Sequence, residues 1–414
     1  MKWPRVPLKE IAPAQTPNIR FSPDEPVWHL TLDQIESHTG NIVNKKIAPA
    51  STAGTSTNVF DDGNVLYSKL RPYLNKVLCP TEPGIATTEL VPLRPRKDLL
   101  DRRYLTYYLR SNHFWGFATV AVAGVKMPRI IMAKFWKHNI PLPPLSEQRR
   151  IVEILDQADE LRKKRAEADA KAARILPSLF YKMFGDPLAN PHAFQIETIG
   201  SLLTLLRNGT TTEQNQDGHG YPVTRIETIS EGVINPDRVR YVDIDDSELK
   251  RWQLEPGDIL FSHINSESHI GKTAIYKGHP DPLIHGMNLL LLRPDVKKIR
   301  PEYLFAVLNT DSVRSAYRQK CKRAVNQASL NQRDISSLKV AVPPIDLQGR
   351  FCNLADNVLR QVGAQLKATE NINRLFDNLL NRAFTSDLTA KWREAHMKDI
   401  LVEMEHQAKA LKGN

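Results

Sequence analysis

The feature that most constrains the fold of this 414-residue chain is an internal repeat with a period near 200 residues. The segment Asp62–Ser68 (DGNVLYS) returns as Pro256–Ser262 (PGDILFS), and the segment Pro143–Gln148 (PPLSEQ) returns as Pro343–Gln348 (PPIDLQ). Leu93-Arg-Pro95 also returns, as Leu292-Arg-Pro294. An ordered series of matches indicates a duplicated structural unit rather than chance. We therefore expect two copies of one fold.

The first part of each copy combines strands with short helices. Apolar runs such as 65–67 and 259–261 are bounded by glycine and proline, which is typical of strands. Helix-like segments at 104–109 and 301–308 lie between such runs. This mixture predicts a compact α+β domain in each copy.

The second part of each copy predicts a long helix that begins after a Pro-Pro pair. Ser146 and Asp346 are suitable N-cap residues. Apolar or small residues then recur at a spacing of three and four, which is typical of a coiled-coil seam. The expected seam positions are Ile151, Ile154, Ala158, Leu161, Ala168, Ala172, Ile175 and Leu179 in the first copy, and Phe351, Leu354, Val358, Ala368, Ile372, Leu375 and Leu379 in the second. We expect Pro177 to kink the first helix or to end it early.

The length of these helices favours pairing with each other over packing on a single domain. Residues 146–184 would rise roughly 58 Å as one helix, which is long for a domain of this size, although an ordinary amphipathic helix packed on its own domain remains an alternative. The simplest pairing is antiparallel, with a pseudo-two-fold axis between the copies. The expected parts are a first globular domain, a first spacer helix, a second globular domain, a second spacer helix and a C-terminal helical tail, at residues 1–145, 146–184, 185–345, 346–386 and 387–414.

Charge favours a polyanionic partner. The formal net charge is +11, and the windows 102–138 and 312–333 contain Lys and Arg but no Asp or Glu. These windows occupy equivalent places in the two copies, just before the Pro-Pro pair, which favours a surface that faces phosphates. The alternative is a basic surface for an acidic protein.

Polar loops in and near these windows are candidates for reading DNA bases, because Arg and Lys pair with guanine edges while Asn and Gln pair with adenine edges. A loop after the repeated strand, at 68–76 and 262–272, carries different polar residues in the two copies, as two readers of different half-sites require. The expected DNA-binding residues are Lys69, Arg71, Asn75, Lys76, Lys126 and Arg129 in the first copy, and Arg225, His263, Asn265, Lys272, Lys322, Arg323, Asn326 and Gln327 in the second.

Sequence patterns for catalysis, metal binding and membrane insertion are missing. The three cysteines form no C-x-x-C pair, and Gly271-Lys272-Thr273 lacks the first glycine of a phosphate-binding loop because position 266 is Ser. Neither a signal peptide nor a membrane-spanning run is expected. Unpaired cysteines suit a reducing cytoplasm, and we expect no metal or cofactor on this chain.

The chain resembles the specificity subunits of type I restriction–modification systems over nearly its whole length. The resemblance is carried by the two Pro-Pro-(Leu/Ile)-x-x-Gln helix openings, by Leu66–Leu74 (LYSKLRPYL), by Phe184-Gly-Asp-Pro187 and by Leu388–Arg393 (LTAKWR). It implies two target-recognition domains that read a bipartite DNA site, and helices that set the spacer and dock two methyltransferase subunits. Gln148, Arg150, Gln348 and Arg350 are the candidate docking residues at the helix openings. The second opening departs from the usual Glu-Gln, with Leu347 in place of the Glu147 of the first.

The resemblance also implies that this chain is not itself an enzyme. S-adenosylmethionine, ATP and Mg²⁺ are expected on the methyltransferase and ATP-dependent restriction subunits. Two further hypotheses are a helical scaffold whose globular ends bind proteins, and a self-sufficient nucleic-acid enzyme.

Overall fold

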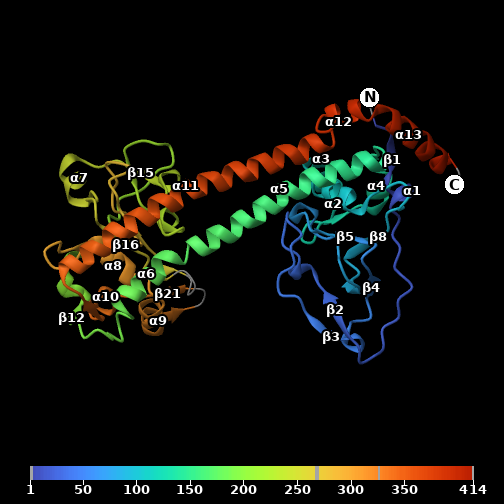
Figure 1. Ribbon diagram of the computed structural model, residues 1–414. Coiled ribbons are helices and arrows are strands. Elements are labelled where there is room, and N and C mark those ends of the chain that lie inside the picture. The colour runs from blue at the N-terminus through green and yellow to red at the C-terminus, as the bar shows by residue number, and fades with distance from the viewer. Residues whose placement is uncertain (1–2, 266–269, 325–326, 413–414) are drawn as a thin grey trace. The chain divides into compact units, whose positions relative to one another are not determined.

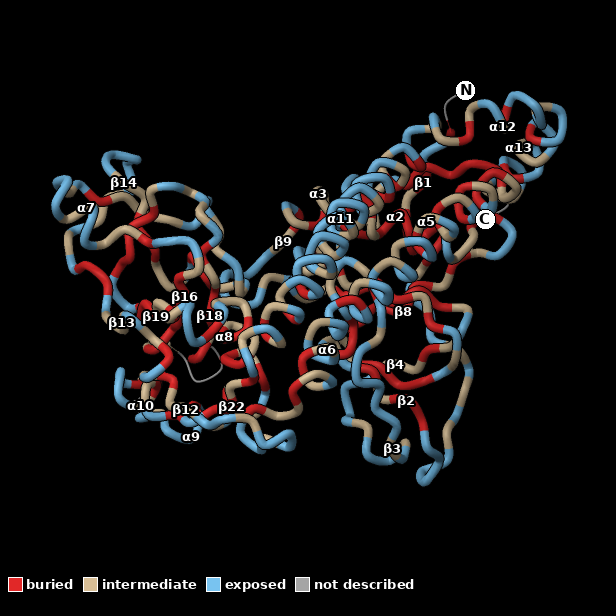
Figure 2. Tube along the Cα trace, turned by 60° about the vertical axis from the view of Figure 1, so that its left-hand side comes forward, coloured by how far each residue is buried: buried red, intermediate tan, exposed pale blue. Residues whose placement is uncertain are grey.

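The computed structural model describes residues 3–265, 270–324 and 327–412, with only the backbone described for 323, 324 and 327. The chain forms two compact units, one made of Met1–Ala166 with Lys367–Asn414 and the other of Glu167–Leu366. Each unit contains one globular domain and parts of two long helical segments (Figure 1). In both domains the buried positions follow the central strands (Figure 2).

The first domain is built on two small sheets. One has the strand order β3-β2-β7-β4 and the other the order β6-β5-β8. The strands are β2 (Pro26–Leu30), β3 (Ile47–Pro49), β4 (Thr57–Phe60), β5 (Val65–Ser68), β6 (Val77–Leu78), β7 (Gly84–Thr87) and β8 (Leu90–Leu93). After β8 come α2 (Arg102–Arg110), α3 (Asn112–Val120), the hairpin of β9 (Val122–Ala123) and β10 (Arg129–Ile130), and α4 (Met132–Lys137). Strand β11 (Asn139–Pro141) then returns to pair with β1 (Arg5–Pro7), just before α1 (Leu8–Ile11).

The second domain repeats this order with different outer parts. Its main sheet has the order β13-β19-β16-β18, in which β16 pairs with β18 and β19 as β5 pairs with β6 and β8. These strands are β13 (Leu203–Asn208), β16 (Ile259–Phe261), β18 (Thr273–Ile275) and β19 (Leu290–Pro294). The outer part holds β14 (Tyr221–Val223), β15 (Arg240–Val242) and α7 (Asp246–Trp252). The repeated elements are α8 (Pro301–Leu308), α9 (Asp311–Lys320), β20 (Lys322–Ala324), β21 (Gln327–Ser329) and α10 (Gln332–Ser336), and β22 (Lys339–Val342) pairs with β12 (Gln195–Thr198).

Matching hydrogen bonds confirm that the two domains are copies of one fold. The Tyr104 hydroxyl donates to the Pro141 carbonyl at 3.0 Å, and the Tyr303 hydroxyl donates to the Ala341 carbonyl at the same distance. At the helix openings, Gln148 Oε1 accepts from the backbone of Asp101, and Gln348 Oε1 accepts from the backbone of Arg300, both at 2.8 Å.

The first long segment is broken, whereas the second is continuous. Helix α5 (Leu145–Ala172) ends shortly before α6 (Ile175–Phe184), and Pro177 lies in the first turn of α6, where the missing N–H has no intrahelical acceptor. Helix α11 (Ile345–Ala383) runs for 39 residues without interruption. The tail forms α12 (Ala390–Ala395) and α13 (Met397–Lys412).

Within each unit the helical segments pack antiparallel. In the first unit, Glu147 at the start of α5 bonds Arg393 beyond the end of α11, while Arg162 further along α5 lies over the ring of Phe376. In the second unit, Phe180 and Phe184 of α6 contact Phe351 near the start of α11. Pseudo-two-fold symmetry between the units stays a prediction.

The expected seam is rotated in several places. Leu161, Leu354 and Leu375 are 48%, 45% and 51% exposed, so their assignment to a buried seam is wrong. In the last third of α11 the buried positions are Phe376, Leu380 and Ala383, offset by one residue from the expected stripe. The buried face of this part of α11 therefore carries Phe376, which packs in the core of the first unit.

Candidate nucleic-acid interface

In the first domain, the two loops predicted to read DNA lie against each other. The Arg71 amide donates to the Pro128 carbonyl at 2.7 Å, and the Ile130 amide donates to the Lys69 carbonyl at 2.9 Å. Leu70 and Arg129 also form a β-bridge, so Lys69, Arg71 and Arg129 share one surface. Arg71 adopts the left-handed conformation with φ +49°, which a non-glycine residue adopts rarely and at an energetic cost.

The hairpin that carries Lys126 projects this surface outward. Its tip, residues 123–127, is exposed, and Val125 reaches 99% exposure. An exposed tip of mixed basic and apolar residues can approach a groove, where apolar groups contact thymine methyls and lysines contact phosphates or guanine.

Arg129 is held by a carboxylate that the sequence analysis missed. Its guanidinium donates to both oxygens of Glu89, with Nη2 to Oε1 at 2.8 Å and Nε to Oε2 at 3.2 Å. The hydrogen bond and the charge of Glu89 raise the pKa of Arg129. Glu89 therefore occupies the fork of donors that a guanine edge would need, so a base contact by Arg129 would require the displacement of Glu89.

Asn75 and Lys76 serve the fold of this loop. Asn75 is buried with φ +46°, and its amide donates to the Arg110 carbonyl at 2.9 Å. The Lys76 ammonium donates to the Leu32 carbonyl at 2.6 Å. The direct DNA contact that the sequence predicts for Asn75 conflicts with this burial, because its side chain faces the interior.

In the second domain, the structure again brings the two predicted loops together. Strand β17 (Ile264–Asn265) pairs with β21, and the Leu330 amide donates to the His263 carbonyl at 2.9 Å. This pairing places the backbone of His263 and Asn265 beside the hairpin that begins at the exposed Lys322.

Side chains in this loop are more buried than those of the first domain. His263 is 8% exposed, and burial lowers its pKa, so the neutral imidazole is favoured. The Asn265 amide donates to the Ser262 hydroxyl at 3.2 Å, and the Lys272 ammonium donates to the Ser230 carbonyl at 2.7 Å. Asn326 lies outside the described residues, and Arg323 and Gln327 are described only as parts of β20 and β21.

Arg225 lies apart from these loops. It follows β14 in the outer part of the domain, where its guanidinium pairs with Glu227 at 2.9 Å and donates to Gln214 Oε1 at 3.2 Å. No described contact joins it to the β17–β21–β20 surface.

The glutamines at the helix openings have a role that differs from the predicted one. Gln148 and Gln348 are both fully buried, and Gln148 Nε2 donates to the carbonyls of Leu99 and Pro143 at 2.8 and 2.7 Å. These amides fasten each helix to its own domain and present nothing to a partner. Arg150 and Arg350 reach the surface, and Arg150 pairs with Glu153 at 2.6 Å.

Comparison with known proteins identifies the family of this fold. The family model described as the type I restriction modification DNA specificity domain matches residues 4–168 and 191–370, once in each copy of the repeat. The chain belongs to this family. The repeat, the paired loops and the buried glutamines are therefore features of a DNA-specificity domain that occurs twice.

Relatives with this family's name cover different shares of the chain. A putative type I restriction enzyme MjaX specificity subunit from Methanocaldococcus jannaschii is 42% identical over 196 residues, which is 47% of this chain and 46% of that protein. The chain thus spans about half the length of this relative. The type I restriction enzyme EcoKI specificity subunit of Escherichia coli K12 is 28% identical over 346 residues, covering 77% of this chain and 72% of that protein.

Solved structures support the fold. A chain from a study of complex assembly and conformational transition of the type I R-M system aligns with a TM-score of 0.60 at 20% identity, over 94% of this chain and 98% of that chain. The S subunit of a type I system from M. genitalium aligns with a TM-score of 0.55 at 13% identity, over 93% of this chain and 96% of that chain.

Two negative findings concern the described residues alone. Among them, no group of three or more His, Cys, Asp or Glu side chains is placed to hold a metal ion. None of the described helices combines the length and the apolar character needed to cross a bilayer.

Proposed function

We propose that this chain is the DNA-specificity subunit of a cytoplasmic type I restriction–modification complex and catalyses no reaction itself. In this proposal each globular domain reads one half of a bipartite duplex target. The observation that carries it is that the same two loops meet in both copies of the fold (Leu70 with Arg129, and β17 with β21) but carry different polar side chains. One scaffold with two unlike reading surfaces suits a target with two unlike halves.

The helices are proposed to set the distance between the half-sites and to dock two methyltransferase subunits. Leu354, Leu359 and Leu366 on α11 are each 44–54% exposed, which provides apolar contact area along the helix. The exposed Arg350 and the partly exposed Arg150 lie near the helix openings. S-adenosylmethionine, Mg²⁺ and ATP are proposed to bind the methyltransferase and restriction subunits.

Methylome sequencing tests this proposal most directly. A host that expresses the chain with its methyltransferase partner should acquire methylated adenines in one bipartite motif with an unspecified spacer. Exchange of residues 190–340 for the equivalent segment of a relative should change one half of that motif only. A change in both halves, or in neither, contradicts the assignment of one domain to each half-site.

Two biochemical measurements separate this function from its alternatives. Binding of the purified complex to duplex DNA should weaken steeply with salt, because contacts to phosphates release counterions. A flat salt dependence would indicate a protein-binding scaffold instead. Turnover of DNA by the isolated chain would indicate an enzyme.

A further inference from the structure

The space beside Val77 in the first domain and beside Thr273 in the second, which we call the slot, is filled differently in the two domains. In the first domain, the Ser68 amide donates to the Lys76 carbonyl and the Lys76 ammonium donates to the Leu32 carbonyl. In the second, the Ser262 amide donates to the Lys272 carbonyl and the Lys272 ammonium donates to the Ser230 carbonyl. Lys76 and Lys272 are therefore equivalent, and so are Val77 and Thr273, which follow them.

In the first domain this slot is filled by the chain's own guanidinium. Arg110 Nη2 donates to the Val77 carbonyl at 2.8 Å, and Nε donates to the same oxygen at 3.3 Å. The side chain lies against Gly40, where an added Cβ would come within 1.9 Å of Arg110 Nη2 and 2.1 Å of the Val77 oxygen. Gly40, with φ +67°, therefore provides the space that the Arg110 guanidinium occupies.

In the second domain the filling residue is absent. Ser111 and Thr310 each donate a hydroxyl hydrogen to the carbonyl three residues earlier, at 2.6 and 2.8 Å, so Asn309 is the equivalent of Arg110. Asn309 Nδ2 donates to the Thr273 hydroxyl at 2.7 Å and extends no further. Gly232 faces the Thr273 carbonyl across the slot, as Gly40 faces that of Val77, but its nearest neighbour is 3.9 Å from an added Cβ.

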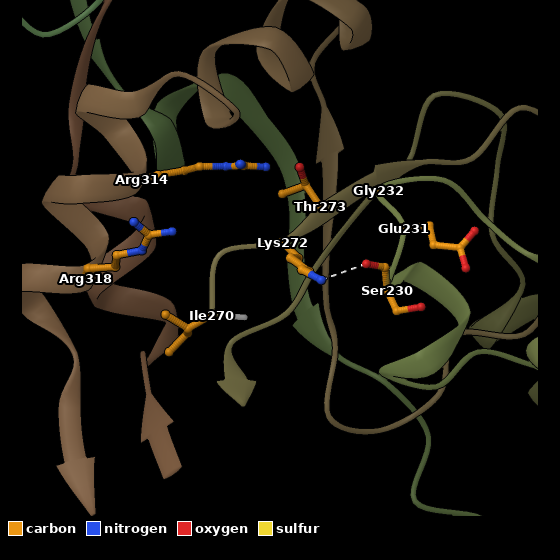
Figure 3. A pocket seen from close by; sticks show the side chains of 8 residues that line it. All are labelled: Ser230, Glu231, Gly232, Ile270, Lys272, Thr273, Arg314 and Arg318. Atoms are coloured by element: carbon orange, nitrogen blue, oxygen red, sulfur yellow. Dashed lines mark hydrogen bonds between the residues drawn. The ribbon is translucent and has the colours of Figure 1, made fainter. Parts of the chain in front are cut away.

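A cavity of about 220 Å³ takes the place of the guanidinium. Helix α9 contributes Arg314 and Arg318 on one side, and Lys272 and the 230–232 loop lie on the other (Figure 3). The residues that line it are Ser230, Glu231, Gly232, Ile270, Lys272, Thr273, Arg314 and Arg318. By the same equivalence, Trp115 and Thr119 stand in the first domain where Arg314 and Arg318 stand here, so this cationic lining belongs to the second domain alone.

Among the described residues, the lining of the cavity is mainly positive, with Lys272, Arg314 and Arg318 against the single carboxylate of Glu231. Within the described part of the chain, no carboxylate lies within 4 Å of Lys272, Arg314 or Arg318. The one acidic lining residue, Glu231, pairs with Arg238 at 2.9 Å.

Arg314 is the most constrained of the three cations. Its Nη2 donates to Asn309 Oδ1, whereas its buried Nε has no hydrogen-bond partner among the described residues. Burial, and after it the neighbouring charge of Arg318, lower the pKa of Arg314, and the smaller effect of the Asp311 charge opposes them. A buried donor without a partner is unfavourable, and an anion in the cavity would relieve it.

We propose that this cavity binds a single phosphate group of the target DNA backbone beside the half-site that the second domain reads. The inference rests on the proposed function, and it names a contact that the first domain does not make. Two guanidiniums and an ammonium around one oxyanion provide charge-assisted hydrogen bonds, which position the duplex but carry no base information.

The first test removes one exposed cation. Arg318→Ala should weaken binding of the assembled complex to cognate and non-cognate duplexes by the same factor, on the order of tenfold, and reduce the slope of log K against log salt by about 1. Lys320→Ala is the matched control, since Lys320 is exposed on the same helix but does not line the cavity. An equal effect of both substitutions, or no effect of either, overturns the proposal.

The second test fills the cavity with an arginine side chain, as Arg110 fills the slot of the first domain. Asn309→Arg should place a guanidinium in the slot and weaken DNA binding, although the net charge rises by one. Stronger binding, as simple charge attraction predicts, would contradict a phosphate site. Circular dichroism and thermal unfolding of both variants establish that the effect on binding does not come from loss of the fold.

The third test identifies the source of the phosphate. Neutral methylphosphonates placed one at a time across the target should reveal one position at which the wild-type complex loses affinity and Arg318→Ala does not. Inorganic phosphate that binds in titration calorimetry, with no such position in the DNA, would assign the site to a free anion and overturn the DNA contact. If the wild-type complex recognises no bipartite target, the proposed function fails; if it does but the variants behave normally, only the phosphate site fails.

Discussion

Replacement of Glu147 should destabilise the first unit more than any surface substitution on the same helix. Glu147 is fully buried at the opening of α5. Its Oε2 accepts from the Trp3 indole at 2.9 Å, and its Oε1 accepts from the Thr389 hydroxyl at 2.5 Å and from Arg393 Nε at 2.7 Å. One carboxylate therefore joins the N-terminal strand region, the first long helix and the C-terminal tail.

The magnitude follows from what remains after substitution. Arg393 is 6% exposed and would keep only neutral oxygens as partners, namely the Ser386 carbonyl and the Thr389 hydroxyl. Removing one member of a buried ion pair costs about 3–5 kcal/mol, because the other charge stays buried without compensation. Glu147→Leu should thus lower the free energy of unfolding of the first unit by about that amount, and α12 and α13 should exchange amide hydrogens faster.

Urea unfolding of the full chain, together with hydrogen exchange resolved to residues 387–412, measures both effects. Glu153→Leu is the control, since Glu153 is exposed on the same helix and its pair with Arg150 is expected to contribute only about 0.2–1 kcal/mol. The double variant Glu147→Leu with Arg393→Leu should recover much of the loss, because apolar replacement of both partners removes the uncompensated charge. A single variant that costs under about 1 kcal/mol, or a double variant as unstable as the two single losses added, would refute this reasoning.

Three further predictions test the domains. Arg71→Ala should weaken recognition of the half-site read by the first domain, and Arg323→Ala that of the other half-site, each by about 1–3 kcal/mol of binding free energy. Methylation of targets with a single mismatch in one half-site measures this loss. Unchanged methylation in both variants would show that the sites are misplaced. Gln148→Leu and Gln348→Leu should each leave buried backbone groups unsatisfied and destabilise their own domain by about 1–3 kcal/mol, which domain-resolved hydrogen exchange would detect, and equal loss in both domains from either variant would contradict it. Burial lowers the pKa of His138 to about 4, below the roughly 6.5 of an unfolded histidine, so the unfolded chain binds more protons and the stability present above pH 6.5 is lost as the pH falls toward 4. In His138→Gln, the midpoint of urea unfolding should depend less on pH over this range. An unchanged pH profile would show that His138 is not the source of the pH dependence.

The repeat carries most of what the sequence predicts correctly. Two copies, the order of strands before helices, and the long helices after each Pro-Pro pair all follow from local signals that recur in the same order at offsets near 200 residues. The break before Pro177 follows from the geometry of the proline ring. Each of these depends on residues close together in the sequence, so a single chain is enough to find them.

The rotation of the helix stripe could not be predicted in the same way. Phe376 and Leu375 are adjacent and both apolar, and only the shape of the opposing α5 surface decides which is buried. Arg162 lies over the Phe376 ring at 4.2 Å from its centroid, a contact between residues more than 200 positions apart. The periodicity of apolar residues predicts that the helix has a buried face, but it does not predict to within one residue which positions lie on that face.

In the candidate interface, too, the sequence predicts the features that depend on neighbouring residues and misses those that depend on tertiary contacts. The polar pattern of the sequence predicts Lys126, Arg129 and Lys322, which the structure exposes, but it does not separate them from Asn75, which the fold buries. Glu89 is invisible to a search for basic stretches, because it comes from the β7–β8 turn, 40 residues before the arginine it holds. Contacts of this kind depend on tertiary pairing. The sequence can therefore predict which loops form the surface but not which side chains in them are available to bind DNA.

The one clear departure between the helix openings now has a structural cause. Leu347 stands where the first copy has Glu147, and it packs on the apolar core of the second domain. Among the described residues, the tail contacts the first opening and not the second: Thr389 and Arg393 bond Glu147, and Gln407 Nε2 donates to the Pro143 carbonyl at 3.2 Å. A buried carboxylate is favourable only where a cation meets it, so an opening without the tail is more stable with leucine. Glu147 therefore marks where the tail closes on the first domain, and its absence from the second copy says nothing against a partner that docks along that helix.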